Sequence, residues 1–87
     1  MAPTEDEQRW QTWVDELGES LGVDPSRVDI PAVLGLTREI AHRFDRPMGP
    51  VGSFILGMAL ASNPDASVDD MVSRIEASLP AEEGSAQ

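Results

Sequence analysis

The chain has 87 residues, a formal net charge of −10 and no cysteine. It contains six arginines and no lysine. The lack of cysteine excludes disulfides and thiolate chemistry. The excess of acids argues against nucleic acid and anionic lipid as partners, because their phosphates would be repelled. The N-terminus MAPTEDEQRW lacks the basic and apolar segments of a signal peptide, so we expect a cytoplasmic protein.

The first predicted helix begins near Glu5 and ends before Gly22. Thr4 and Glu7 have the spacing of a capping box, and Gly22 suits the left-handed residue that often follows a helix. The apolar residues at helical spacing on one face are Trp10, Trp13, Val14, Leu17 and Leu21. We expect the two tryptophans to pack in a core or at an interface.

A short helical turn and a second long helix follow. Asp24 followed by a proline is typical of a cap and a first-turn proline, which predicts a turn over residues 24–27. Asp29 caps the next helix, which should end near Asp45 because Pro47 disfavours helical geometry in the residue before it. The predicted apolar face of this helix consists of Val33, Thr37, Ile40 and Phe44.

The third predicted helix begins at Pro50 and is apolar on almost every side through Ala61, with Ser53 as its only polar residue. Such a helix has to be enclosed by others, and it is too short for a bilayer, which needs about 20 apolar residues. Gly52 and Gly57 each cost a helix about 1 kcal/mol relative to alanine. We expect a row of small residues to repay this by close helix packing: Ser53, Gly57 and Ala61.

The fourth predicted helix begins after Ser67, which together with Asp70 resembles a capping box, and stops before Pro80. Its apolar face consists of Val68, Met71, Val72, Ile75 and Leu79. No stretch of the chain alternates as a strand would.

The sequence therefore predicts an all-α fold, a compact four-helix domain whose third helix is largely buried. This single domain should span residues 5–80. An N-terminal tail, residues 1–4, would precede it, and a disordered C-terminal tail, residues 81–87, would follow.

Catalytic and metal sites are not recognisable in the sequence. His42 is the only histidine, and the chain offers no cysteine, lysine or tyrosine to work with it. No zinc-ligand spacing and no calcium loop occurs, and the glycine patterns of nucleotide-binding folds are missing. We expect a protein without enzymatic activity, metal or cofactor.

One cationic patch is the candidate binding site. Residues 30–55 carry three arginines and one histidine against two acids, whereas the flanking segments are strongly acidic. Four residues from this segment could hold a phosphate-bearing small molecule beside the start of the third helix, where N–H groups attract anions: Arg38, His42, Arg46 and Ser53. The alternative is that the arginines pair with Glu39, Asp45 or other acids, or are simply solvated.

The segments WVDELGESLGV and VDIPAVLGLTREIAHRFDRPMGPVGSFILGMA resemble a small helical domain of unknown function that is common in actinobacteria. The resemblance covers residues 13–59. Its most distinctive motifs are Val33-Leu34, Arg38, Ala41-His42, Arg46-Pro47 and Phe54 to Gly57. In that family the domain occurs alone and also joined to a nucleotidyltransferase that attaches GMP to molybdopterin. The resemblance implies a role beside molybdenum-cofactor assembly, with a separate protein partner, and it transfers no site residues.

Two functions follow as hypotheses. The first is a non-catalytic accessory or protein-interaction module, linked to molybdenum-cofactor biosynthesis, whose partner is a molybdenum-cofactor enzyme or transferase. The second is a small-molecule binder that recognises a phosphate-bearing ligand at the cationic patch. A homodimer is compatible with either, since a thin core gains stability from a partner.

Overall fold

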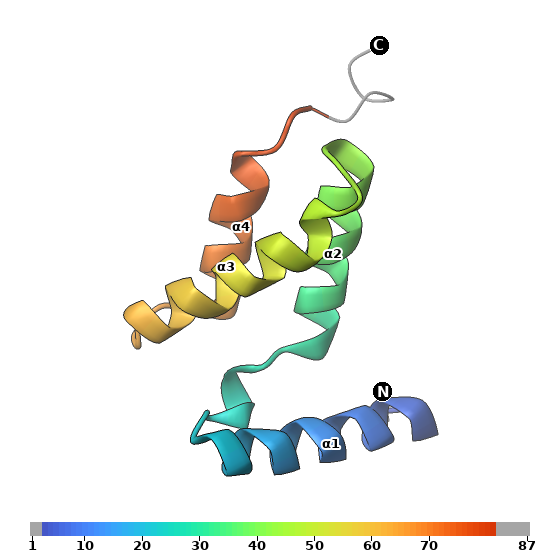
Figure 1. Ribbon diagram of the computed structural model, residues 1–87, viewed down its shortest axis with the longest axis vertical. Helices are drawn as coiled ribbons and strands as arrows, with labels where there is room; N and C mark the ends of the chain where they lie inside the picture. The colour runs from blue at the N-terminus through green and yellow to red at the C-terminus, as the bar shows by residue number, and fades with distance from the viewer. Residues whose placement is uncertain (1–2, 82–87) are drawn as a thin grey trace. The chain divides into compact units, whose positions relative to one another are not determined.

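The computed structural model describes residues 3–81. Its helices are α1 (Glu5–Leu21), the 3-10 helix η1 (Pro25–Arg27), α2 (Ile30–Arg43), α3 (Met48–Ser62) and α4 (Val68–Ala77) (Figure 1). No strand occurs in this range, so the prediction of an all-α fold with four α-helices is confirmed.

The chain divides into two units, residues 1–30 and residues 31–87. The first contains α1 and η1, and the second contains α2, α3 and α4. The single domain expected over residues 5–80 stays a prediction. Most of the expected C-terminal tail and the first two residues of the N-terminal tail lie outside the described residues.

The first unit begins and ends its helix as the sequence predicts. The Thr4 hydroxyl accepts a hydrogen bond from the Glu7 N–H (3.1 Å), and the Thr4 N–H donates to Glu7 Oε1 (2.9 Å), which completes the capping box. Gly22 ends α1 with φ 73°, a left-handed conformation that glycine adopts at no steric cost.

Gly18 allows the chain after α1 to fold back against the helix. It is the one buried residue of α1, and a Cβ atom at this position would lie 2.9 Å from the Val23 carbonyl oxygen and 3.2 Å from Pro25 Cβ. The Val23 N–H donates to the Gly18 carbonyl oxygen at 2.8 Å. The close contact of η1 with α1 therefore depends on a residue without a side chain.

The second unit has a small apolar core that α2, α3 and α4 share. Figure 1 shows α3 running obliquely across α2 towards the start of α4. Its five buried hydrophobic residues are Leu36, Ile40, Leu56, Leu60 and Met71. No polar or charged side chain is buried among the described residues.

Glycines set the close approach of α2 and α3, but at different positions from those expected. A Cβ atom on Gly49 would lie 2.8 Å from Thr37 Cγ2, and one on Gly52 would overlap Ile40 Cδ1. Gly57 has nothing within 4 Å of such a Cβ atom, and Ala61 is exposed. Of the predicted row of small residues, Ser53 does contact Thr37 of α2, but the prediction is wrong for Gly57 and Ala61, because α2 crosses α3 one turn earlier.

Within its unit α3 is buried on one face only. Gly49, Gly52, Leu56 and Leu60 are its buried residues, whereas the large side chains on the opposite face, Val51, Phe54, Ile55 and Met58, are exposed. The expectation that neighbouring helices would enclose α3 on all sides is not met inside this unit. The physical reason is that α2 and α4 approach it from one side, which leaves about half of its circumference uncovered.

Candidate functional site

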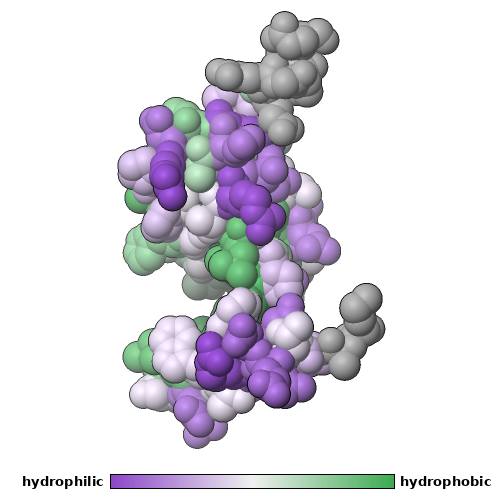
Figure 2. Space-filling model, turned by 90° about the vertical axis from the view of Figure 1, so that its right-hand side faces the viewer, coloured by the Kyte–Doolittle hydropathy of each residue, from purple (hydrophilic) through white to green (hydrophobic). Residues whose placement is uncertain are grey.

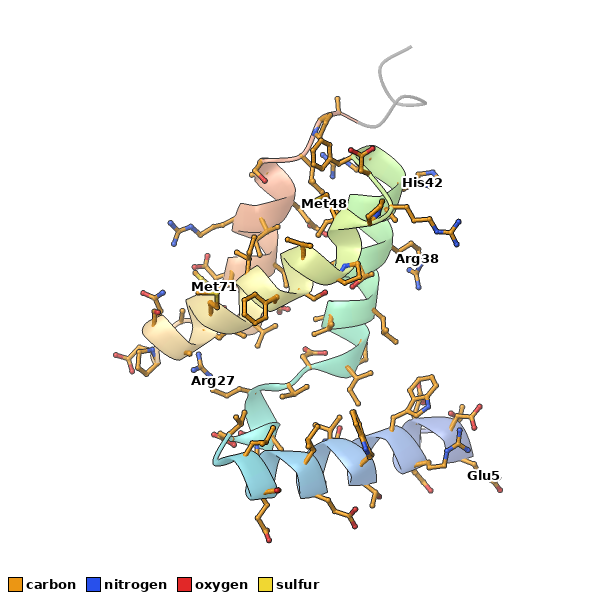
Figure 3. All side chains as sticks on the ribbon, viewed as in Figure 1. Glu5, Arg27, Arg38, His42, Met48 and Met71 are labelled. Atoms are coloured by element: carbon orange, nitrogen blue, oxygen red, sulfur yellow. The ribbon has the colours of Figure 1, made fainter. Side chains whose placement is uncertain are left out.

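Arg38 and His42 lie one helical turn apart on α2. Both are exposed, and Figure 3 shows them projecting from the same side of the helix. Hydrophilic residues gather over the upper part of the face on this side (Figure 2). Within residues 3–81 no ion pair involves either side chain, so the structure leaves both available to an anion.

Arg46 lies in the turn that joins α2 to α3 and is also exposed. This turn closes with two backbone hydrogen bonds, from the Met48 N–H to the Asp45 carbonyl oxygen (3.0 Å) and from the Gly49 N–H to the Arg46 carbonyl oxygen (3.2 Å). It moves the start of α3 to Met48, two residues before the predicted start at Pro50.

The start of α3 offers no hydrogen-bond donor to an anion. A helix N-terminus binds anions through its first N–H groups, which have no partner inside the helix. Here the cap and the third position are Pro47 and Pro50, which have no N–H. The N–H groups of Met48 and Gly49 are already bonded to the preceding turn. Only the weaker helix dipole remains to attract negative charge.

Ser53 belongs to the packing between α2 and α3. Its hydroxyl lies 2.8 Å from the Thr37 hydroxyl and 3.2 Å from the Gly49 carbonyl oxygen, and the Thr37 hydroxyl lies 2.9 Å from the Val33 carbonyl oxygen. Each hydroxyl has one proton, and the two protons can donate in any two of these three contacts, so both donors have acceptors within the unit. Of the four predicted site residues, the structure brings Arg38 and His42 together and gives Ser53 a structural role.

Arg43 has a role that the sequence only partly indicates. Its Nη1 atom lies 3.4 Å from Glu39 Oε1, one of the pairings considered from the sequence. Its Nε donates to the Pro80 carbonyl oxygen (2.9 Å) and its Nη2 to the Leu79 carbonyl oxygen (3.4 Å). Arg43 therefore ties the chain after α4 to the end of α2. Spacing within α2 could suggest the Glu39 pair, but nothing in the sequence indicates the two distant carbonyl groups.

Among the described residues, Asp24 is the one whose pKa clearly departs from its ordinary value. The Ser26 hydroxyl and the Ser26 N–H both donate to its carboxylate, at 2.8 and 3.0 Å. Together with the charge of Arg27, these bonds hold the pKa of Asp24 below its ordinary value. Asp24 is the cap of η1, so this shift belongs to a structural turn.

Metal binding finds no support in the residues that the structure describes. No three His, Asp or Glu side chains within residues 3–81 come together as a metal site would require. No helix in that range is long and apolar enough to cross a bilayer.

Two apolar surfaces remain uncovered, one in each unit. We call the first the α1 face, formed by Trp10, Trp13, Leu17 and Leu21, and the second the α3 stripe, formed by Val51, Phe54, Ile55 and Met58. Sequence reasoning found the residues of the α1 face but missed the α3 stripe, because it assigned that side of the helix to the core. Contiguous exposed apolar surfaces can mark sites of interaction with proteins or membranes, or ligand-binding grooves.

Residues 5–87 match a family described as a domain of unknown function, DUF6457. The chain belongs to the DUF6457 family. This match confirms the coarser part of the resemblance, a small domain of unknown function, and extends it to the end of the chain. No protein of curated function and no solved structure matches the chain.

Proposed function

We propose that this DUF6457 protein is a non-catalytic interaction module of the cytoplasm, which serves molybdenum-cofactor biosynthesis by binding a protein that performs the chemistry. One observation carries the proposal: the α1 face is an amphipathic helix surface that its own unit does not cover. Trp13 is 63% exposed and Leu21 is 66% exposed, although both are large apolar side chains.

The spacing of the α1 face suits a partner with an apolar groove. Its residues recur every three or four positions, as in helices that lay one face into a hydrophobic groove. Tryptophan dominates such contacts, because it removes a large rigid surface from water. Burying a large apolar side chain completely contributes about 1.5–3 kcal/mol, so covering the exposed parts of these four side chains would offset part of the cost of association.

The link to molybdenum-cofactor biosynthesis rests on the resemblance to the actinobacterial domain that is joined in some proteins to a molybdopterin guanylyltransferase. A domain fused to an enzyme in one protein commonly binds the same enzyme when the two are separate chains. We therefore name the guanylyltransferase of the same organism as the partner to test.

Fluorine NMR gives a direct test. Both tryptophans of the chain lie on α1, so incorporation of 5-fluorotryptophan labels the α1 face alone. Addition of the unlabelled guanylyltransferase should shift and broaden both resonances, and Trp13→Glu should abolish the effect on Trp10. Phe54→Glu is the matched control, since it places the same charge on an exposed aromatic position of the other unit, and it should bind normally. Unchanged resonances at a saturating excess of the enzyme would refute this proposal.

A second candidate function is supported by the exposed side chains of Arg38, His42 and Arg46, which form no ion pair within residues 3–81. In this function the cationic patch binds a phosphate-bearing small molecule. A thermal-shift screen with nucleotides and pterin phosphates tests it, since a bound ligand raises the melting temperature. The rise should disappear in Arg38→Ala and persist in Ser53→Ala, because the Ser53 hydroxyl is occupied within the unit. If none of these anions shifts the melting temperature, this second candidate function is refuted.

A further inference from the structure

The α3 stripe has the pattern of a helix-pairing surface. Val51, Phe54, Ile55 and Met58 occupy positions i, i+3, i+4 and i+7 of α3, so they form one continuous strip along the helix. Their exposed fractions are 45%, 70%, 52% and 56%. The buried residues of the same helix lie on the opposite face, so the strip does not belong to the core of the unit.

The charge distribution indicates what can cover the strip. α3 contains no charged residue in its 15 positions, in a chain whose net charge is −10. Two copies of so acidic a chain repel each other, and their approach is least unfavourable where no charge has to be buried. α3 also begins within residues 30–55, a segment that carries three arginines and one histidine against two acids. Two copies of an uncharged strip can face each other without electrostatic repulsion, whereas two copies of an acidic or a basic patch repel each other.

Gly57 and Ala61 extend the strip with small residues. Gly57 lies inside α3, where glycine costs about 1 kcal/mol relative to alanine, yet a Cβ atom there would meet nothing within 4 Å. The packing of its own unit therefore does not require glycine at this position. A second helix that crosses α3 beside Phe54 would require it, because backbones approach closely only over small side chains.

The exposed area agrees with a weak symmetric dimer. With about 150 Å² for each side chain, the lower limit for an aromatic one, the exposed fractions of the four strip residues correspond to roughly 330 Å² per copy. Two copies would bury roughly twice that area, to which Gly57 and Ala61 add. This total lies below the about 1,200–2,000 Å² that stable specific complexes bury, in the range of weak and transient contacts.

We propose that a second copy of this chain binds the α3 stripe, so that two α3 helices pack against each other across a twofold axis. Such an interface uses the same surface on both copies, which is the commonest arrangement in homo-oligomers. The pairing is independent of the function proposed for the α1 face, since it uses a different helix in a different unit.

Sedimentation equilibrium of the full chain, from low micromolar to millimolar concentration, tests this pairing. The wild type should show a reversible monomer–dimer equilibrium with a dissociation constant in the micromolar to millimolar range. Phe54→Glu should raise that constant at least about tenfold, because it would bury two like charges at the axis. Trp13→Glu, which changes an equally exposed aromatic residue on α1, should leave the constant unchanged. A wild type that is monomeric at every concentration would overturn the proposal. An equal loss of dimer affinity in Phe54→Glu and Trp13→Glu would also overturn it.

Cysteine cross-linking locates the contact independently, because the natural chain has no cysteine. Single variants Met58→Cys and Ile55→Cys should form disulfide-linked dimers under mild oxidation much faster than Thr12→Cys, which is exposed on α1. Cross-linking at the same rate in all three would show random collision and contradict an α3 interface. Since binding of the guanylyltransferase is read from the α1 face, failure of one proposal leaves the other measurable.

Discussion

Gly49 and Gly57 lie two turns apart in α3 and have opposite surroundings. Gly49 faces Thr37, whose side chain is fixed by hydrogen bonds to Val33 and Ser53, whereas Gly57 faces open space. Neither has a positive φ. The same substitution should therefore have opposite effects at the two positions.

Gly57→Ala is expected to raise the free energy of unfolding by about 0.5–1 kcal/mol, because alanine loses less backbone entropy in a helix. Gly49→Ala should lower it, by about 1–3 kcal/mol, because the new methyl group would overlap Thr37 and force α2 and α3 apart. Urea denaturation followed by circular dichroism, at a concentration where the chain is monomeric, measures both. A stabilising Gly49→Ala would show that the contact between α2 and α3 is looser than described.

The lowered pKa of Asp24 predicts how the stability of the fold changes at acid pH. Its pKa is lowered in the folded chain, first by the Ser26 hydroxyl, so it stabilises the fold above its unfolded pKa and loses this contribution as the pH falls through the folded value. Ser26→Ala should move the pKa of Asp24 up towards its ordinary value, while the remaining Ser26 N–H keeps it partly lowered. Ser26→Thr retains a hydroxyl and should retain the lowered pKa. NMR titration of the Asp24 carboxyl carbon measures the three values, and an unchanged pKa in Ser26→Ala would contradict the assigned cause.

At the scale of single residues the sequence predicted best where the cause is local. The Thr4 and Glu7 capping box, the left-handed Gly22 and the Ser67 cap of α4 all depend on bonds that span a few residues. The row of small residues in α3 was predicted wrongly at Gly57 and Ala61, because the side of a helix that a neighbour approaches depends on where the two helices cross.

At the scale of elements, Arg43 connects the end of α2 to the chain after α4. Its guanidinium group is largely buried, with 20% of the side chain exposed, and it donates to two carbonyl oxygens and to Glu39. The planar group reaches all three acceptors at once, which a lysine ammonium on a flexible chain cannot do.

Arg43→Lys is therefore expected to lower the free energy of unfolding by about 1–2 kcal/mol, although it keeps the charge. Glu39→Gln should cost less than about 0.5 kcal/mol, since it weakens only one long and half-exposed contact. Urea denaturation compares the two variants. If Arg43→Lys is as stable as the wild type, the two carbonyl contacts do not contribute to stability.

The helix boundaries show what periodicity can and cannot predict. The element order and the apolar face of α4 follow from spacing. The face predicted for α2 is only partly right, since Val33 and Ile40 contribute to the core but Phe44 is exposed. The most buried residue of α2, Leu36, lies outside that predicted face. α3 has no polar face, so spacing could not indicate which of its sides is buried. The structure divides it into a core side of small residues and leucines and an outer side of larger residues, and this division creates the α3 stripe.

At the scale of the whole molecule, the described core belongs to one unit. All five buried hydrophobic residues lie in α2, α3 and α4, and the large apolar residues of α1 are exposed. Single substitutions in the two units should therefore differ sharply in their effect on stability.

Leu36→Ala is expected to lower the free energy of unfolding by about 2–5 kcal/mol, because it leaves a cavity in a small core. Trp13→Ala removes a larger side chain and should cost less than about 1 kcal/mol in the monomer, since most of that side chain is already in water. The ellipticity of the helices during urea denaturation reports both. A loss of several kcal/mol in Trp13→Ala would show that the indole is covered in the isolated chain.

The candidate site was predictable only as a set of charges. The excess of arginine between residues 30 and 55 pointed to Arg38, His42 and Arg46, and all three are exposed. That they bind an anion stays a prediction. The loss of the Ser53 hydroxyl and of the helix N–H groups as ligands was not predictable, because it depends on the packing of α2 on α3 and on the turn that begins α3.

The position of the two indoles also decides what an optical experiment can detect. The chain has no tyrosine, and both tryptophans lie on α1. Intrinsic tryptophan fluorescence therefore reports on the first unit. Unfolding of the helices that form the core would not change this fluorescence. A fluorimeter and a polarimeter would record different transitions from the same cuvette whenever the two units lose their structure separately.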